Sequence, residues 1–236
     1  MPHLWRAKGK DTIVNKVFIT GTDTAVGKTT VSLALLQILK QHGINCAGYK
    51  PVSQNAQPTA QGLQCTDAQL LQQASTCELS YDKINPYPFT GSEVSTGAIT
   101  SVNEQCLTAG MSWLENHVDR LVIEGTGGWH SRINTQHPLS EWVVKENIPV
   151  ILVVGIKLGC INHAILSAES ILQQGGELVG WVANRINPGL EEYQQLITLL
   201  QQHIPAPKLG EVPYLPHIQQ KDLTPYFDVQ ALSFLA

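Results

Sequence analysis

The residues best suited to chemistry lie in one loop, which reads Gly-Thr-Asp-Thr-Ala-Val-Gly-Lys-Thr from Gly21 to Thr29. Phosphate carries concentrated negative charge, and backbone N–H groups at a helix N-terminus together with Lys28 are suited to hold it. Thr29 supplies the hydroxyl that a phosphate-bound Mg²⁺ takes as a ligand. Five residues separate Gly21 from Gly27, one more than in the common phosphate loop. The alternative interpretation is an ordinary turn whose lysine and threonine only cap a helix.

Two carboxylates and a second lysine stand at positions where ligands collect. Glu124 ends the apolar run 121–123 and opens a glycine-rich loop, which places it at the carboxyl edge of a parallel sheet. Asp67 is the second residue of the helix predicted over 66–75. From its residue type alone, it is interpreted as an acid that stabilises the first turn of this helix. Lys50 follows the run 46–49, where the alternative is a solvated charge at a strand end.

The elements that must position these residues follow an alternating pattern. The run 17–20 predicts a strand and 28–42 a helix, because Val31, Leu35, Ile38 and Leu39 recur at helical spacing. Further runs at 121–123, 150–154 and 178–183 predict strands buried on both faces, and a second amphipathic helix follows Gly159. The pattern predicts an α/β fold: a single P-loop NTPase-like domain over 17–236, with a mostly parallel central sheet and helices on both faces. Residues 1–16 are predicted to be a flexible extension.

Composition narrows the function classes. The 236 residues carry a formal net charge of -4 with scattered basic residues, so neither nucleic acid nor an anionic membrane surface is an expected partner. Five cysteines without a C-x-x-C pair favour a reducing cytoplasm, and the absence of H-E-x-x-H gives a zinc site little support. Residues 1–16 lack the apolar segment of a standard signal peptide.

The chain resembles the dethiobiotin synthetase family, whose phosphate loop reads Gly-Thr-Asp-Thr-x-Val-Gly-Lys-Thr with the same extended spacing. The resemblance continues through nearly the whole sequence, in blocks at 48–52, 67, 124–129, 153–155, 159–163, 180–184 and 210–213. It implies an ATP-dependent cyclo-ligase of biotin biosynthesis that uses Mg²⁺, ATP and carbon dioxide to convert 7,8-diaminononanoate to dethiobiotin. The implied route passes through a carbamate and a carbamic-phosphoric anhydride, in a cytoplasmic homodimer with the active site at the interface.

The resemblance also implies roles for individual residues. Lys28 and Lys50 are the implied catalytic residues, and the implied metal ligands are Thr29, Asp67 and Glu124. The implied nucleotide-binding residues are Ala25, Val26, Gly27, Lys28, Thr29, Thr30, Asp67, Glu124, Gly125, Thr126 and Gly127, with Asn184, Arg185, Pro213, Tyr214 and Leu215 at the adenine. The implied substrate-binding residues are Thr24, Gln54, Tyr193 and, from the partner subunit's helix start, Gly159, Cys160, Ile161 and Asn162.

Three positions depart from the commonest family pattern: Ala25 replaces a frequent acid, Gln54 a frequent serine, and Thr126 a frequent alanine. These changes resemble the second-copy paralogues found in some bacteria. The main alternative function is a nucleotide-switched dimer of the partitioning or metallochaperone type. Such proteins usually carry an additional lysine early in the loop, where this chain has residues 22–24. A related amide-forming enzyme acting on a corrinoid precursor normally adds a glutaminase domain, for which this chain has no room.

Overall fold

The computed structural model describes residues 14–91, 102–132 and 137–235. Its centre is a six-stranded sheet with the order β10-β9-β8-β1-β7-β2, in which every neighbouring pair is parallel. The strands are β1 (Lys16–Gly21), β2 (Cys46–Tyr49), β7 (Arg120–Glu124), β8 (Val150–Gly155), β9 (Leu178–Asn184) and β10 (Lys208–Val212). The strands predicted at 17–20, 121–123, 150–154 and 178–183 are therefore confirmed.

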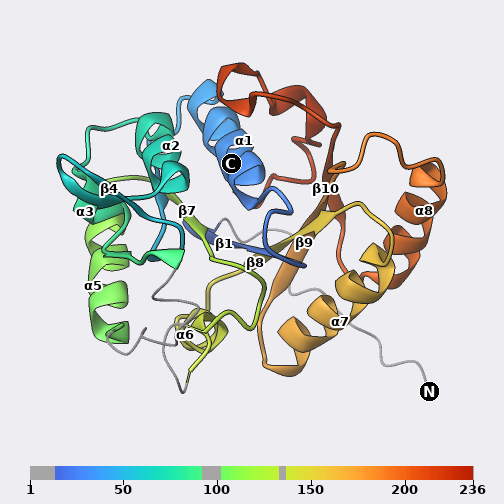
Figure 1. The fold of residues 1–236 in the computed structure, drawn as a ribbon, viewed down its shortest axis with the longest axis horizontal. Helices are drawn as coiled ribbons and strands as arrows, with labels where there is room; N and C mark the ends of the chain where they lie inside the picture. Colours follow the sequence, from blue (N-terminus) through green and yellow to red (C-terminus); the bar gives the residue numbers. More distant parts are fainter. Residues whose placement is uncertain (1–13, 92–101, 133–136, 236) are drawn as a thin grey trace.

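Helices cover both faces of this sheet (Figure 1). One face is covered by α1 (Lys28–Gln41), α2 (Thr66–Ala74) and the C-terminal segment with the short helices η1 (Ile218–Gln220) and η2 (Thr224–Tyr226). The other face is covered by α5 (Glu104–Glu115), α6 (Leu139–Lys145), α7 (Cys160–Gln173) and α8 (Tyr193–His203). The helices predicted at 28–42, at 66–75 and after Gly159 are confirmed, as is the layered α/β architecture.

Alternation along the strands explains the two layers. In β1, Val17 and Ile19 pack into the cluster under α1, whereas Phe18 packs into the cluster under α5 to α8. Successive strand residues point to opposite faces, so a strand that is apolar at every position is buried on both sides. Each such side chain contributes roughly 1.5–3 kcal/mol on burial, which fixes the sheet firmly beneath the loops at its carboxyl edge.

The segment between β2 and α5 is less regular. It contains the two-residue strand β3 (Val52–Ser53), which pairs in parallel with β6 (Tyr87–Pro88), and a hairpin of β4 (Gln57–Thr59) and β5 (Gly62–Gln64). The short helix α3 (Tyr81–Ile84) precedes β6. Pairing continues past β3, because the Ala56 N–H donates to the Phe89 carbonyl at 2.9 Å. This pairing brings residues 54–56 next to residues 89–91.

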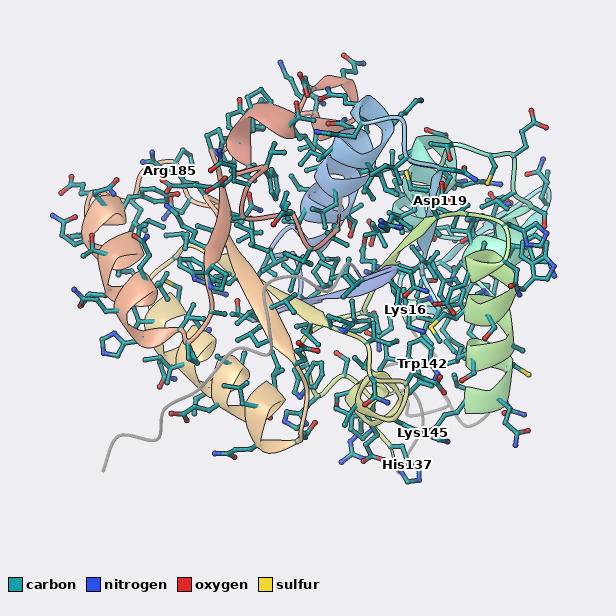
Figure 2. The ribbon with its side chains drawn as sticks, turned by 180° about the vertical axis from the view of Figure 1, so that it is seen from behind. Lys16, Asp119, His137, Trp142, Lys145 and Arg185 are labelled. Atoms are coloured by element: carbon teal, nitrogen blue, oxygen red, sulfur yellow. The ribbon has the colours of Figure 1, made fainter. Side chains whose placement is uncertain are left out.

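The predicted extension lies mostly outside the described residues, which begin at Val14. The Val14 N–H donates to the Phe234 carbonyl at 2.8 Å, and Lys16 begins β1 and pairs with Glu115 at 3.0 Å. Lys16, at the start of β1, is labelled in Figure 2. Within the described ranges, no helix combines the length and apolar character needed to cross a membrane.

Candidate active site

The phosphate loop joins β1 to α1, as predicted. Gly27 is the N-cap of α1 with φ 92° and ψ 32°, a left-handed conformation that glycine adopts readily. A Cβ at Gly27 would collide with the side-chain amide of Asn184, which donates to the Val26 carbonyl at 2.8 Å. Asn184 is the last residue of β9. The end of β9 therefore fixes the shape of the phosphate loop, and it does so by close contact with a glycine.

Lys28 is buried at the start of α1, with 7% of its surface exposed. Its Nζ donates to the Asp23 carbonyl at 3.2 Å. Burial, together with the nearby charge of Lys50, lowers the pKa of Lys28 to about 8. A phosphate group at this position would offset both causes, because an anion stabilises the charged amine.

Lys50 is at the centre of a buried group of charges. Its Nζ lies 2.5 Å from Glu124 Oε1 and 3.3 Å from Asp67 Oδ2, and the Thr29 hydroxyl donates to the same Glu124 oxygen at 2.9 Å. Burial opposes the charged form of Lys50, but the charges of Glu124 and Asp67 outweigh it and hold the pKa of Lys50 above its ordinary value. Residues from four separate segments thus meet at one point.

The oxygen atoms of this group fit magnesium. Glu124 is fully buried, and in the described part of the chain nothing hydrogen-bonds its second oxygen, Oε2. The Thr29 hydroxyl and the Asp67 carboxylate complete a set of hard oxygen donors, the type that Mg²⁺ prefers. The described residues contain no cluster of three or more His, Cys, Asp or Glu side chains suited to a metal. The remaining ligands would therefore be phosphate and water oxygens.

These groups surround one cavity of about 450 Å³. Its lining comes from the phosphate loop, the carboxyl ends of β2 and β7, the segments after β3 and β6, and the start of α2. It consists of Thr24, Ala25, Gly27, Lys28, Thr29, Lys50, Gln54, Asn55, Asp67, Gly91, Glu124, Thr126 and Gly127. Eleven of these thirteen residues are among the predicted site residues. Three predicted nucleotide-binding residues, Val26, Thr30 and Gly125, are buried beside the cavity instead.

Asn55 and Gly91 line the cavity although the sequence analysis did not identify them. Asn55 directly follows the predicted substrate residue Gln54, and this position in the sequence could have identified it as a lining residue. Gly91 had no local signal, because its place depends on the pairing that brings residues 89–91 beside residues 54–56.

The residues predicted at the adenine lie at the same edge of the sheet, outside the cavity lining. Arg185 follows β9, and its N–H donates to the Val212 carbonyl of β10 at 2.9 Å. The Arg185 guanidinium lies 4.6 Å from the ring centroid of Tyr193, the first residue of α8. Figure 2 shows Arg185 next to α8, well away from Lys145 of α6. Tyr214 is 52% exposed, and Pro213 and Leu215 beside it are half-buried.

The start of α7 also lies outside the cavity lining of its own chain. Gly159 is the exposed N-cap with φ 82°, Asn162 is exposed, and Ile161 is half-buried. Cys160 is 1% exposed, so its side chain is a packing residue. Lys157, three residues before α7, pairs with Asp23 at 2.9 Å and connects this loop to the phosphate loop.

Solved structures with this fold have low sequence identity to the chain. A ParA family ATPase from Chlorobium tepidum TLS superposes with a TM-score of 0.55 at 12% identity, over 94% of this chain and 95% of that one. The MinD cell division protein of Aquifex aeolicus gives a TM-score of 0.54 at 13% identity, over 86% and 84% of the two chains. At this identity the likeness establishes the fold alone.

Sequence relatives are much closer. The family described as AAA domain matches residues 15–222. The ATP-dependent dethiobiotin synthetase BioD 2 of Yersinia pestis is 49% identical over 94% of this chain and its own full length. BioD 2 of Escherichia coli K12 is also 49% identical, over 93% of this chain and 95% of its own length. The ATP-dependent dethiobiotin synthetase BioD of Vibrio campbellii is 43% identical, over 93% of this chain and 99% of its own length. Because these relatives match nearly the whole chain, the chain belongs to the dethiobiotin synthetase family.

Proposed function

We propose that this protein is an ATP-dependent ligase that converts 7,8-diaminononanoate and carbon dioxide to dethiobiotin in biotin biosynthesis. The observation that carries the proposal is the meeting of Lys28, Thr29, Lys50, Asp67 and Glu124 around one cavity. Two cations and two carboxylates beside a phosphate loop suit phosphoryl transfer to an anionic acceptor. The similarity to proteins named ATP-dependent dethiobiotin synthetase supports the carbamate of the diamine as that acceptor.

The proposed reaction has three steps. One amine adds to the carbon of carbon dioxide and loses a proton, which gives a carbamate. A carbamate oxygen attacks the γ-phosphorus of ATP, the bond to the β-phosphate oxygen breaks, and ADP leaves. The second amine then attacks the carbamate carbon, inorganic phosphate leaves with the bonding electrons, and a proton is released as the ureido ring closes.

The two lysines would stabilise the negative charge that develops in these steps. Lys28 lines the cavity from the start of α1, and Lys50 lines it from the end of β2. We propose that both ammonium groups face the transferred phosphoryl group and the carbamate oxygens. Magnesium, held by Thr29, Asp67 and Glu124, would neutralise phosphate charge and orient the γ-phosphate. The buried, unbonded Oε2 of Glu124 supports this assignment.

Each amine must be neutral when it attacks. For an alkyl amine with a pKa near 10.4, deprotonation at pH 7 costs roughly 4–5 kcal/mol. The positive charges of Lys28 and Lys50 lower the pKa of a nearby amine and reduce this cost. The group that accepts the amine proton is left unassigned.

The carboxylate tail of the diamine requires hydrogen-bond donors at the far end of the pocket. We propose that these are the N–H groups at the start of α7 in a second copy of the chain, assisted by Tyr193, and that the enzyme is a homodimer. Two exposed leucines support this: Leu158 (79%) in the loop just before α7, and Leu166 (56%) on α7. Burial on a second subunit would remove these two side chains from water.

The pocket residues of this chain suit the second-copy type within the family. Gln54 lines the cavity and has Asn55 next to it, so two amides occur there. We propose that they contact the polar groups of the diamine. All five cysteines are unpaired thiols, which suits a reducing compartment, and we propose a cytoplasmic location.

One assay tests the function. Purified protein is supplied with Mg-ATP, bicarbonate and 7,8-diaminononanoate, and dethiobiotin is measured by mass spectrometry alongside phosphate release. Phosphate release that requires the diamine and bicarbonate together is the expected result. Phosphate release that is equally fast without the diamine, with no dethiobiotin formed, would instead indicate a nucleotide-switched ATPase.

A further inference from the structure

The side chain of Asn85 lies in the core just after α3, with 1% of its surface exposed. Its Nδ2 donates to the Lys50 carbonyl at 2.7 Å. Its Oδ1 accepts from the Ser53 hydroxyl at 2.8 Å and from the Tyr81 hydroxyl at 2.9 Å. Both ends of this amide are therefore used inside the protein, next to a predicted catalytic lysine.

The contacts of Asn85 fix the backbone of Lys50. The Lys50 N–H donates to the Ile84 carbonyl at 2.7 Å, and the Lys50 carbonyl accepts from Asn85. Lys50 follows the last residue of β2, so the ladder of the central sheet does not hold it. Residues 84 and 85 thus hold both backbone groups of the residue whose Nζ must reach Glu124.

The same contacts extend to the start of α2. The Tyr81 hydroxyl, which donates to Asn85, accepts from the Cys65 N–H at 2.7 Å. Cys65 is the N-cap of α2, and its sulfur accepts from the Ala68 N–H at 3.4 Å and lies 3.8 Å from Asn85 Oδ1. Asp67 is two residues further along. Asn85 therefore connects the backbone of Lys50 to the helix that carries Asp67.

We propose that Asn85 is the positioning residue of this active site, setting the distance between Lys50 and the carboxylates of Asp67 and Glu124. The proposal rests on the proposed function for the roles of those three residues. An amide is needed because it donates to one backbone carbonyl and accepts from two hydroxyls, whereas an ionised carboxylate only accepts. In Asn85→Asp a carboxylate oxygen would face the Lys50 carbonyl and push the lysine backbone away.

The kinetic test compares three variants. Asn85→Asp removes the donor to Lys50, and Tyr81→Phe removes the hydroxyl between Asn85 and Cys65. The control, Thr108→Val, removes hydrogen bonds to Trp142 (3.0 Å) and Glu146 (2.8 Å) under α6, away from the cavity. Asn85→Asp is expected to lower kcat for dethiobiotin formation about 10- to 100-fold, with KM for ATP changed less than about twofold. Tyr81→Phe is expected to have a smaller effect in the same direction, and Thr108→Val none.

A double-mutant cycle separates positioning from general loss of structure. In a Lys50→Gln background, measured in single turnovers, Asn85→Asp is expected to cause no further loss of rate, because its effect acts through Lys50. An equal fold-loss in both backgrounds would overturn the proposal, as would an unchanged kcat in Asn85→Asp. If Asn85→Asp does not fold, Tyr81→Phe in the two backgrounds supplies the same comparison.

A measurement without substrates separates this proposal from the proposed function. The ammonium signal of Lys50 is recorded by NMR in protein with isotope-labelled lysine and is identified by its loss in Lys50→Gln. It is expected to shift in Asn85→Asp and in Tyr81→Phe, and to stay in place in Thr108→Val. If the wild-type protein forms no dethiobiotin, the proposed function fails, yet an unchanged Lys50 signal alone would overturn the positioning role.

Discussion

The Lys50 ammonium and the Glu124 carboxylate form a buried ion pair, with 2.5 Å between Nζ and Oε1. The pair stands where the nucleotide, the metal and the diamine are proposed to meet. Because Glu124 also accepts from Thr29, one carboxylate connects the end of β7 to the phosphate loop and to the end of β2. A change to either partner should therefore affect both the free energy of unfolding and the catalytic rate, which can be measured separately.

Lys50→Gln is expected to lower turnover about 100-fold or more, because a cation facing the transition state is lost. Binding of a non-hydrolysable ATP analogue is expected to persist, since Lys28 and the loop N–H groups remain. The free energy of unfolding should fall by roughly 3 kcal/mol, because Glu124 is left buried without its partner. The dethiobiotin assay measures turnover, titration calorimetry measures binding of the analogue, and chemical denaturation measures the free energy of unfolding.

The matched control for this variant is Lys145→Gln on α6, whose partner Glu104 lies 3.4 Å away at the surface (Lys145 is labelled in Figure 2). An exposed pair of this kind contributes less than about 1 kcal/mol. Turnover of Lys50→Gln equal to that of Lys145→Gln would remove Lys50 from the catalytic residues.

Glu124→Gln is expected to raise the Mg²⁺ concentration needed for half-maximal turnover. Loss of a charged ligand in a buried site costs roughly 2 kcal/mol, or about 30-fold in affinity. Electron paramagnetic resonance of Mn²⁺, titrated in the presence of the ATP analogue, measures the same loss without turnover. The exposed Glu141→Gln serves as the control, and identical Mn²⁺ affinity in the two variants would argue against Glu124 as a ligand.

Nucleotide affinity should depend on pH above the lowered pKa of Lys28, about 8. Phosphate favours the protonated amine, so above that pH binding must be accompanied by proton uptake. The affinity for the ATP analogue is then expected to fall with rising pH, by at most about tenfold per pH unit. Titration calorimetry between about pH 7 and about pH 9.5 tests this, since the buffer-dependent heat reports the proton uptake.

Lys28→Arg gives the comparison for the pH profile. Arginine keeps its charge throughout this range, so the decline above the lysine pKa should disappear even if the overall affinity is lower. A decline of the same size in the arginine variant would assign the pH dependence to another group.

Leu166→Lys tests the proposed dimer. A charge at residue 166 of α7 removes the gain from burying one leucine, roughly 1.5–3 kcal/mol, and should weaken the dimer about 10- to 100-fold. Analytical ultracentrifugation is expected to show more monomer, and KM for the diamine should rise while binding of the ATP analogue is retained. Leu199→Lys, on α8 and 39% exposed, is the control. A wild-type chain that is monomeric at all concentrations would contradict the proposal.

Much of the site could be predicted from local sequence. Lys28 and Thr29 stand in a motif whose chemistry depends on neighbours in the chain, and Glu124 and Lys50 each follow a recognisable apolar strand. Asp67 needed the family resemblance, because a first-turn acid occurs in many helices. The structure then placed its carboxylate 3.3 Å from Lys50.

Other features could not be predicted because they depend on contacts between distant segments. The strands β3 and β6 are two residues long, and only their pairing, 35 residues apart at Val52 and Tyr87, brings Gly91 to the cavity. Asn85 stands beside Pro86 and Pro88 in the sequence, which gives no sign that it is buried, and its role depends on Lys50 and Tyr81 folding around it. The α8 helix buries only Ile197 and Leu200 fully, and none of the predicted helix ranges covers it.

The strand order also sets the distance between the end of β1 and the end of β2. β7 separates β1 from β2, and adjacent strands lie about 4.8 Å apart, so the end of β2 is roughly 10 Å from the end of β1. A residue after β2 lies one strand from Glu124, at the end of β7, and two strands from the loop after β1. The lysine side chain bridges the first of these spacings, since its Nζ lies 2.5 Å from Glu124 Oε1. In the proposed active site, the spacing of a hydrogen-bonded sheet thus favours a long, positively charged side chain at residue 50.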